Sequence, residues 1–152
     1  MSMGADGLRQ ASADAVLNAN YLMARLQDLL PPPFEGPCMH EVLIDDQFLR
    51  GTEVTTLDFA KALIDEGFHP MTIYFPLVVQ GALLIEPTET ESKGSLEQYI
   101  AVVRYLAEQV KSGRTEDFKN APRLTPRRRL DETAAARNPV LRWRPPTQEA
   151  AE

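Results

Sequence analysis

Three residues that could do chemistry stand where the local sequence would fix their position. Glu86 ends an apolar run, and Pro87 after it cannot donate a hydrogen bond to a neighbouring strand and keeps Glu86 extended. We therefore expect the Glu86 carboxylate at the end of a strand, on the rim of a pocket. Glu41 lies inside an apolar stretch, where a carboxylate needs a partner or a functional role. His40 beside it is expected in the core or an interface, with a pocket position as the alternative.

The patterns of several common catalytic and metal sites are missing from the sequence. The two histidines, His40 and His69, lie far apart, and a single cysteine gives them little support as a zinc site. No glycine-rich phosphate loop and no GxSxG nucleophile motif occurs. The basic run Arg127–Arg129 lacks interleaved aromatic residues, which favours a solvated or salt-bridged surface over a nucleic-acid site.

The hydrophobic pattern predicts an α+β fold in the order helix, strand, helix, two strands, helix. Apolar residues recur at steps of three and four over residues 5–30, which predicts one long helix. Residues 37–45 are apolar on both faces, so we expect a covered strand with His40 and Glu41 projecting to opposite sides. Residues 71–74 and 82–85 predict two short buried strands.

Capping residues set the expected limits of the other two helices. Thr55 with Asp58 predicts a helix start, and Gly67 predicts a left-handed stop. Ser95 with Gln98 predicts a capping box for the last long helix.

The chain of 152 residues suits one domain with an extension. We place the domain at residues 1–113 and an extended Pro/Arg-rich tail at residues 114–152, because helical periodicity is lost there. One helical turn is expected near residues 131–137 and disorder at 149–152. Trp143 is a candidate to anchor the tail to a neighbouring surface.

Charge and composition narrow the class of protein. The net charge is −6, but the first hundred residues hold 5 basic and 15 acidic residues, while the remainder holds 11 and 7. This division allows the tail to lie across the body or a partner, and gives little support to nucleic-acid binding. The single cysteine, Cys38, favours a reducing cytoplasm, and no apolar run reaches the roughly 20 residues of a membrane span, so we expect a soluble protein.

Five stretches, in sequence order, resemble one known family. They are NANYLMARL at 18–26, GPCMHEVLI at 36–44, TTLDFAKALIDEGFHP at 55–70, GFHPMTIYFPLVVQGALLIEPTETESK at 67–93 and RRLDETAAARNPVLRW at 128–143. Together they are similar to the C-terminal part of the glycine-cleavage P protein, the pyridoxal-phosphate-dependent decarboxylating glycine dehydrogenase. The match is most like the second subunit of the two-subunit bacterial form. Met71 departs from the pattern, because a second proline is expected there.

The resemblance implies the small C-terminal domain of a fold-type-I, aspartate-aminotransferase-like enzyme, with a long N-terminal helix, a short mixed or antiparallel sheet and an irregular tail. Members bind pyridoxal phosphate through a lysine of a large domain, decarboxylate glycine and pass the aminomethyl group to the lipoyl arm of H protein. The four lysines of this chain are Lys61, Lys93, Lys111 and Lys119, and none matches the cofactor-lysine motif. The chain is therefore expected to be inactive without the large domain and the other subunit.

The small domain of such enzymes closes over the cofactor and shapes the substrate site. The resemblance therefore implies candidates for the pocket rim, namely His40, Glu41, His69, Thr88 and Glu89. For Thr88 and Glu89 the alternative is capping of the next helix, since acidic residues suit a helix N-terminus.

A competing hypothesis is a free-standing α+β module that binds an amino acid for regulation, without catalysis. An exposed apolar patch of several hundred Å² would favour the fragment over the free-standing module.

Overall fold

The computed structural model describes residues 2–143, so the predicted disorder at 149–152 lies outside the described residues. The elements are α1 (Gly4–Leu26), β1 (Val42–Ile44), the 3-10 helix η1 (Asp46–Leu49), α2 (Thr56–Asp65), β2 (Thr72–Ile73), β3 (Leu83–Ile85), α3 (Lys93–Lys111), α4 (Thr115–Lys119) and α5 (Glu132–Arg137). This order confirms the predicted α+β fold. None of the helices between residues 2 and 143 combines the length and apolar character that crossing a bilayer requires.

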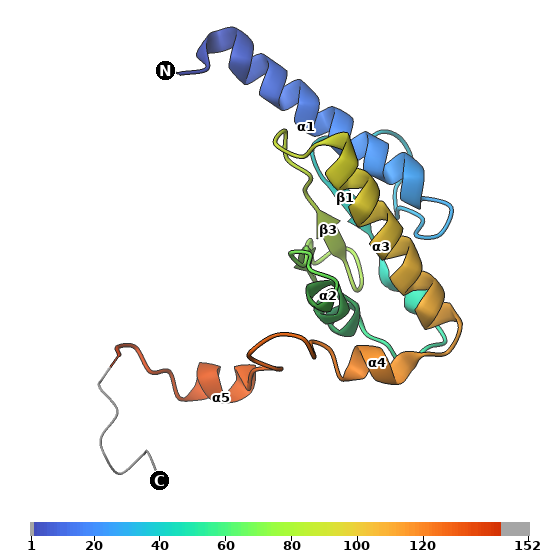
Figure 1. Ribbon diagram of the computed structural model, residues 1–152, viewed down its shortest axis with the longest axis vertical. Coiled ribbons are helices and arrows are strands. Elements are labelled where there is room, and N and C mark those ends of the chain that lie inside the picture. Colours follow the sequence, from blue (N-terminus) through green and yellow to red (C-terminus); the bar gives the residue numbers. More distant parts are fainter. Residues whose placement is uncertain (1, 144–152) are drawn as a thin grey trace.

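A small antiparallel sheet lies at the centre, in the order β1-β3-β2. α1 and α3 lie side by side next to the sheet, with α1 in contact with β1. α2 contacts β2 and α3 (Figure 1). Side chains along each strand point alternately to the two faces of the sheet, and one face is buried; it includes Val42, Ile44 and Leu83. These residues join one core with fully buried side chains of the helices, among them Leu22, Leu26, Phe59, Leu63, Ile100, Val103 and Val110.

The strand predicted over residues 37–45 is shorter than expected, and its first half is wrong. The strand is only Val42–Ile44, because the backbone at Cys38 bonds elsewhere. The Asn20 amide donates to the Cys38 carbonyl at 2.7 Å, and its oxygen accepts from the Cys38 N–H at 3.1 Å. Helix α1 also ends at Leu26 rather than at residue 30.

Helix caps agree with the sequence at one helix and differ at another. The helix start predicted at Thr55 and Asp58 is confirmed, and the two residues form a capping box, with the Asp58 N–H 3.2 Å from Thr55 Oγ1 and the Thr55 N–H 2.8 Å from Asp58 Oδ2. Gly67 has the predicted positive φ, 84°. The cap predicted at Ser95 is wrong: Ser92 caps α3, accepting from the Ser95 N–H at 3.1 Å, so the helix begins almost one turn earlier.

The chain beyond residue 113 returns to the core before it leaves the body. Phe118 of α4 is buried and stacks on Phe59, with ring centroids 6.3 Å apart. α5 forms where one helical turn is predicted and lies away from the body in Figure 1. The domain limits 1–113 and 114–152 stay a prediction.

Candidate functional site

A cavity of about 420 Å³ lies between α1, the chain around β2 and β3, and the first turns of α3. Its apolar walls include Leu22, Phe68, Met71, Leu84 and Leu96, and its polar lining includes His69, Thr72, Glu86, Thr88, Glu91, Ser95 and Tyr99. An apolar hollow with a few polar groups is the usual form of a small-molecule site.

The polar rim is built where β3 ends. Glu86 is exposed and Pro87 buried, so the chain turns at the place that the proline predicts. Asn18 of α1 holds the following turn, since its amide donates to the carbonyls of Thr88 at 2.9 Å and Glu91 at 3.2 Å. The rim is therefore fixed by a side chain 70 residues away in sequence.

Tyr99 lines the cavity with a hydroxyl that is buried and has no hydrogen-bond partner among the described residues. Its ring packs edge-on against Phe68, with centroids 5.4 Å apart. Burial raises the pKa of the Tyr99 hydroxyl far above its usual value, so the group is neutral and can still donate a hydrogen bond. Buried polar groups are rarely left unpaired, which marks this position as one that a further group would complete.

The structure brings only part of the predicted rim together. His69 and Thr88 line the cavity, as does Glu86, whereas His40, Glu41 and Glu89 do not line it. His40 is exposed, so its predicted place in the core is wrong; the loop before β1 carries it outward.

Capping of α3, the alternative for Thr88 and Glu89, is also wrong, since Ser92 is the cap and no acidic residue lies in the first turn of the helix. Tyr99 was missed because its position suits the buried stripe of α3, and the sequence does not show that its hydroxyl lacks a partner.

The cavity does not fit the pyridoxal phosphate that the resemblance implies. Among the described residues, its lining holds the carboxylates of Glu86 and Glu91 and no lysine or arginine. A phosphate needs cationic or N–H donors, and two carboxylates repel it. The lysines lie elsewhere: Lys119, for example, pairs with Glu53, and Lys93 lies 5.9 Å from the centre of the Tyr21 ring.

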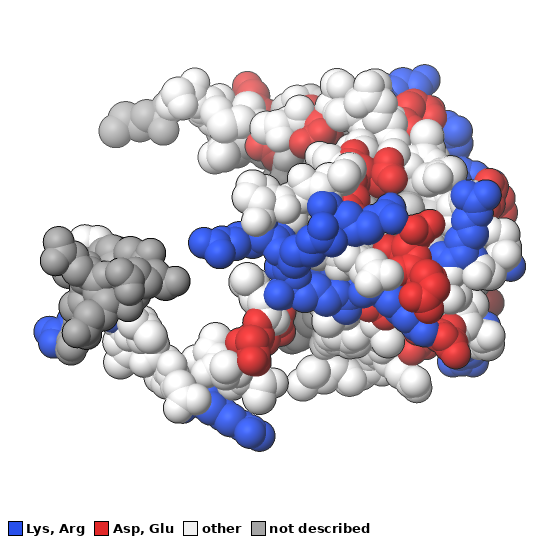
Figure 2. Space-filling model, turned by 60° about the horizontal axis from the view of Figure 1, so that its bottom comes forward, with Lys and Arg blue, Asp and Glu red and all other residues white. Residues whose placement is uncertain are grey.

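The basic run and the neighbouring acidic side chains form a mixed surface. Figure 2, which views the molecule from the end that carries α4, shows a band of basic side chains beside a cluster of acidic ones. Arg129 pairs with Asp58 at 2.6 Å, and Arg127 and Arg128 are exposed. This confirms the prediction of a solvated and salt-bridged run.

The loop between β2 and β3 exposes apolar side chains. Leu77 is 88% and Val78 86% exposed, with Tyr74 and Phe75 beside them also exposed. Tyr74 adopts a positive φ of 58°, rare for a residue other than glycine. A contiguous apolar loop of this kind is typical of a surface that a partner covers.

Comparison with known proteins identifies the family. The family model "Glycine dehydrogenase, C-terminal domain" matches residues 11–127. A probable glycine dehydrogenase (decarboxylating) subunit 2 of Caulobacter vibrioides is 68% identical over 146 residues, which is 95% of this chain and 28% of that protein.

Proteins of the same name from Kosmotoga olearia and Caldanaerobacter subterraneus are 48% and 50% identical, over 97% and 94% of this chain and 31% and 29% of their own lengths. The chain thus spans less than a third of the curated relatives it matches. On these matches, the chain belongs to the glycine dehydrogenase C-terminal domain family.

Proposed function

We propose that this chain is the C-terminal part of a pyridoxal-phosphate-dependent glycine dehydrogenase of the glycine cleavage system. The complete enzyme decarboxylates glycine and transfers the aminomethyl group to the lipoyl arm of H protein. The observation that carries the proposal is the family match over residues 11–127, with 68% identity to a named subunit 2. Because the chain covers 28% of that relative, we assign the activity to the complete enzyme only.

The cofactor belongs to the part of the enzyme that this chain lacks. When bound, it supplies the electron sink for decarboxylation. The acidic cavity supports a cofactor site outside this chain, since its lining offers no cation for the phosphate and none of the four lysines lines it. The role proposed for this chain is to shape the substrate pocket and to exclude water from it.

Two of the rim candidates lie at one end of the sheet. His69 and Thr88 line the cavity there. Val42, the first residue of β1, pairs with Ile85, the last residue of β3, so Glu41 and Glu86 adjoin the same end of the sheet. We propose that His40, Glu41, His69, Thr88 and Glu89 border the substrate pocket of the assembled enzyme.

The free-standing regulatory module is the weaker alternative. Such a module would cover its apolar surface, whereas Leu77 and Val78 lie almost fully in solvent. This exposure favours a chain that completes a larger assembly.

Complementation tests the proposal. The chain is added to the remainder of the Caulobacter subunit 2 together with the other subunit, and exchange of labelled bicarbonate with the carboxyl group of glycine is measured. We expect no exchange from either part alone, and restored exchange from the mixture.

A stoichiometric adduct of pyridoxal phosphate, fixed by borohydride to a lysine of the isolated chain, would instead make this chain a minimal enzyme. No restored exchange from well-folded parts would contradict the proposed function.

A further inference from the structure

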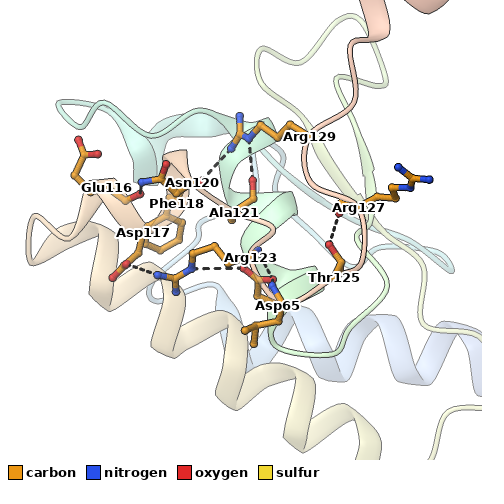
Figure 3. Close-up of polar contacts among 11 residues, drawn as sticks. Asp65, Glu116, Asp117, Phe118, Asn120, Ala121, Arg123, Thr125, Arg127 and Arg129 are labelled. Atoms are coloured by element: carbon orange, nitrogen blue, oxygen red, sulfur yellow. Dashed lines mark hydrogen bonds and ion pairs between the residues drawn. The ribbon is translucent and has the colours of Figure 1, made fainter. Parts of the chain in front are cut away.

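The segment that follows α4 is held to the body at its base by a carboxylate of α2. Asp65 accepts the Arg123 N–H at 2.7 Å on each carboxylate oxygen and the Leu124 N–H at 2.8 Å (Figure 3). The Asp65 side chain is only 8% exposed, and charge-assisted hydrogen bonds of this kind are among the stronger ones. The position at which the chain leaves the core is therefore fixed.

A second clamp holds the same segment six residues further on. Arg129 donates to the carbonyls of Ala121 at 2.8 Å and Phe118 at 3.0 Å, and it pairs with Asp58 at 2.6 Å. Burial disfavours the charged form of Asp58, but hydrogen bonds from Thr55 and Arg129 outweigh it and lower its pKa. Asp58 is thus ionised at neutral pH, and its ion pair with Arg129 is formed.

From Leu124 onward the chain exposes its large apolar side chains to solvent instead of packing them in its own core. We call residues 124–143 the arm. Its large apolar residues are all 69–90% exposed, namely Leu124, Leu130, Val140, Leu141 and Trp143, and α5 within it buries no residue. Burial of one such side chain contributes about 1.5–3 kcal/mol, so the arm leaves a large stabilisation unused.

The arm also differs in charge from the body. It carries five arginines against two acidic residues, a net charge of +3, while residues 1–123 hold 10 basic and 18 acidic residues, a net charge of −8. The arm therefore suits an apolar surface with a carboxylate border.

At least one relative has a segment that matches the arm, although most of the arm lies beyond the family model. The family model ends at residue 127, but the match to the Kosmotoga protein covers 97% of the 152 residues and leaves about five unmatched. That match includes most of the chain beyond 127, at 48% identity overall. The large apolar side chains of this segment are left out of the core, so their contacts are expected outside it.

We propose that the arm is a docking element that binds the part of glycine dehydrogenase subunit 2 absent from this chain, with Leu141 and Trp143 inserted in an acidic-rimmed apolar groove. This inference rests on the proposed function. The relatives are more than three times longer than the matched region, so most of the surface of such a subunit is missing here. Two buried carboxylates fix the base of the arm and so present its apolar end to that surface.

Trp143 is the only tryptophan and reports on docking directly. The chain is labelled with 5-fluorotryptophan, and the unlabelled remainder of the Caulobacter subunit 2 is titrated while the single ¹⁹F resonance is followed. We expect a saturable shift of that resonance. Leu141→Asp should abolish the shift and weaken binding at least about tenfold, since it buries a charge in an apolar contact. The volume-conserving control Leu141→Met should preserve both.

A second measurement does not require the remainder to fold alone. In a chimera, this chain replaces the C-terminal region of the Caulobacter protein, and trypsin cleavage after Arg137 and Arg142 is compared with cleavage of the isolated chain. We expect rapid cleavage in the isolated chain and protection in the chimera, lost again with Leu141→Asp.

Each other outcome has a distinct meaning. Equal cleavage in the chimera, or an unmoved resonance with a partner whose binding is established by sedimentation, overturns the arm inference and leaves the proposed function intact. A shift that appears in the chain alone as its concentration rises identifies a second copy as the partner, and a shift that needs the other subunit identifies that subunit; both overturn the proposal. No binding together with no restored activity contradicts the proposed function as well.

Discussion

The buried hydroxyl of Tyr99 indicates where a ligand or a neighbouring domain would contact this chain. The ring of Tyr99 packs edge-on against Phe68. Its hydroxyl has no partner among the described residues. A buried unpaired hydroxyl costs about 1–3 kcal/mol, a cost that a ligand or a neighbouring domain would remove.

Tyr99→Phe should stabilise the isolated chain. Removing the unpaired hydroxyl is expected to raise the free energy of unfolding by about 1 kcal/mol at pH 7, as measured by urea titration. The pKa of Tyr99 is raised in the folded chain, so above the unfolded value of about 10 the unfolded chain releases this proton more readily, and the stability of the wild type falls as pH rises further. The variant should lose less stability between pH 9 and pH 11. Identical alkaline profiles would show that the hydroxyl is solvated.

Asp58 carries the opposite pH dependence. Its folded pKa is lowered, so the stability it contributes is present above the unfolded value of about 3.9 and is lost as pH falls through the lower folded value. Asp58→Asn weakens both the capping box and the pair with Arg129. We expect a cost of about 1–2 kcal/mol at pH 7, limited because Arg129 is partly exposed.

The difference between wild type and Asp58→Asn should shrink towards pH 3. Thermal unfolding from pH 3 to pH 7 measures it, with Asp117→Asn as a control on an exposed carboxylate. A constant difference across that range would exclude the carboxylate charge as its source.

At the scale of elements, the backbone turn before β3 depends on the absence of a side chain. Gly81 has a φ of 59°, its carbonyl accepts from Thr56 Oγ1 at 2.8 Å, and a Cβ built there would lie 2.6 Å from Asp46 Cγ. Gly81→Ala should cost about 2–4 kcal/mol, from strain and overpacking together. Gly51→Ala is the matched control, because Gly51 has a positive φ and open space around it. Equal losses in urea unfolding would mean that strain alone acts.

The start of α3 offers a direct test of the cap that the sequence misplaced. Ser92→Ala should cost about 1 kcal/mol, because it removes the oxygen that accepts the Ser95 N–H. Ser95→Ala, in the first turn, should cost less than half of that. Urea unfolding measures the loss of stability in both variants. A larger loss for Ser95→Ala than for Ser92→Ala would identify Ser95 as the cap.

Local patterns predicted the elements well and their limits less well. The start of α2 at Thr55 and Asp58, the Gly67 stop and the order of the elements follow from short-range chemistry, and the structure has all three. The strand at residue 38 was wrong because Asn20 takes both of that residue's backbone hydrogen bonds. The cavity was only partly predicted for the same reason: contacts such as Asn18 to Thr88 and Glu91 join segments far apart in the chain, and periodicity does not contain them.

At the scale of the whole molecule, the stable core and the exposed apolar segments divide the chain into two kinds of surface. The core packs α1, α2, α3 and the sheet together with Phe118 of α4. The β2–β3 loop and the arm contribute apolar side chains that this core does not use. Changes in the loop should therefore affect assembly far more than folding.

The pair Leu77→Ser and Val78→Ser tests that separation. In the isolated chain the double variant should change the free energy of unfolding by less than about 0.5 kcal/mol, because both side chains already lie in solvent. In the complementation assay it should weaken the affinity for the remainder of the enzyme by about tenfold or more, since buried apolar anchors carry much of the energy of an interface. Leu77→Met with Val78→Ile keeps the apolar surface and should behave as wild type. Unchanged affinity and activity in the serine variant would mean that the loop stays in solvent in the assembled enzyme, and would favour the free-standing module instead.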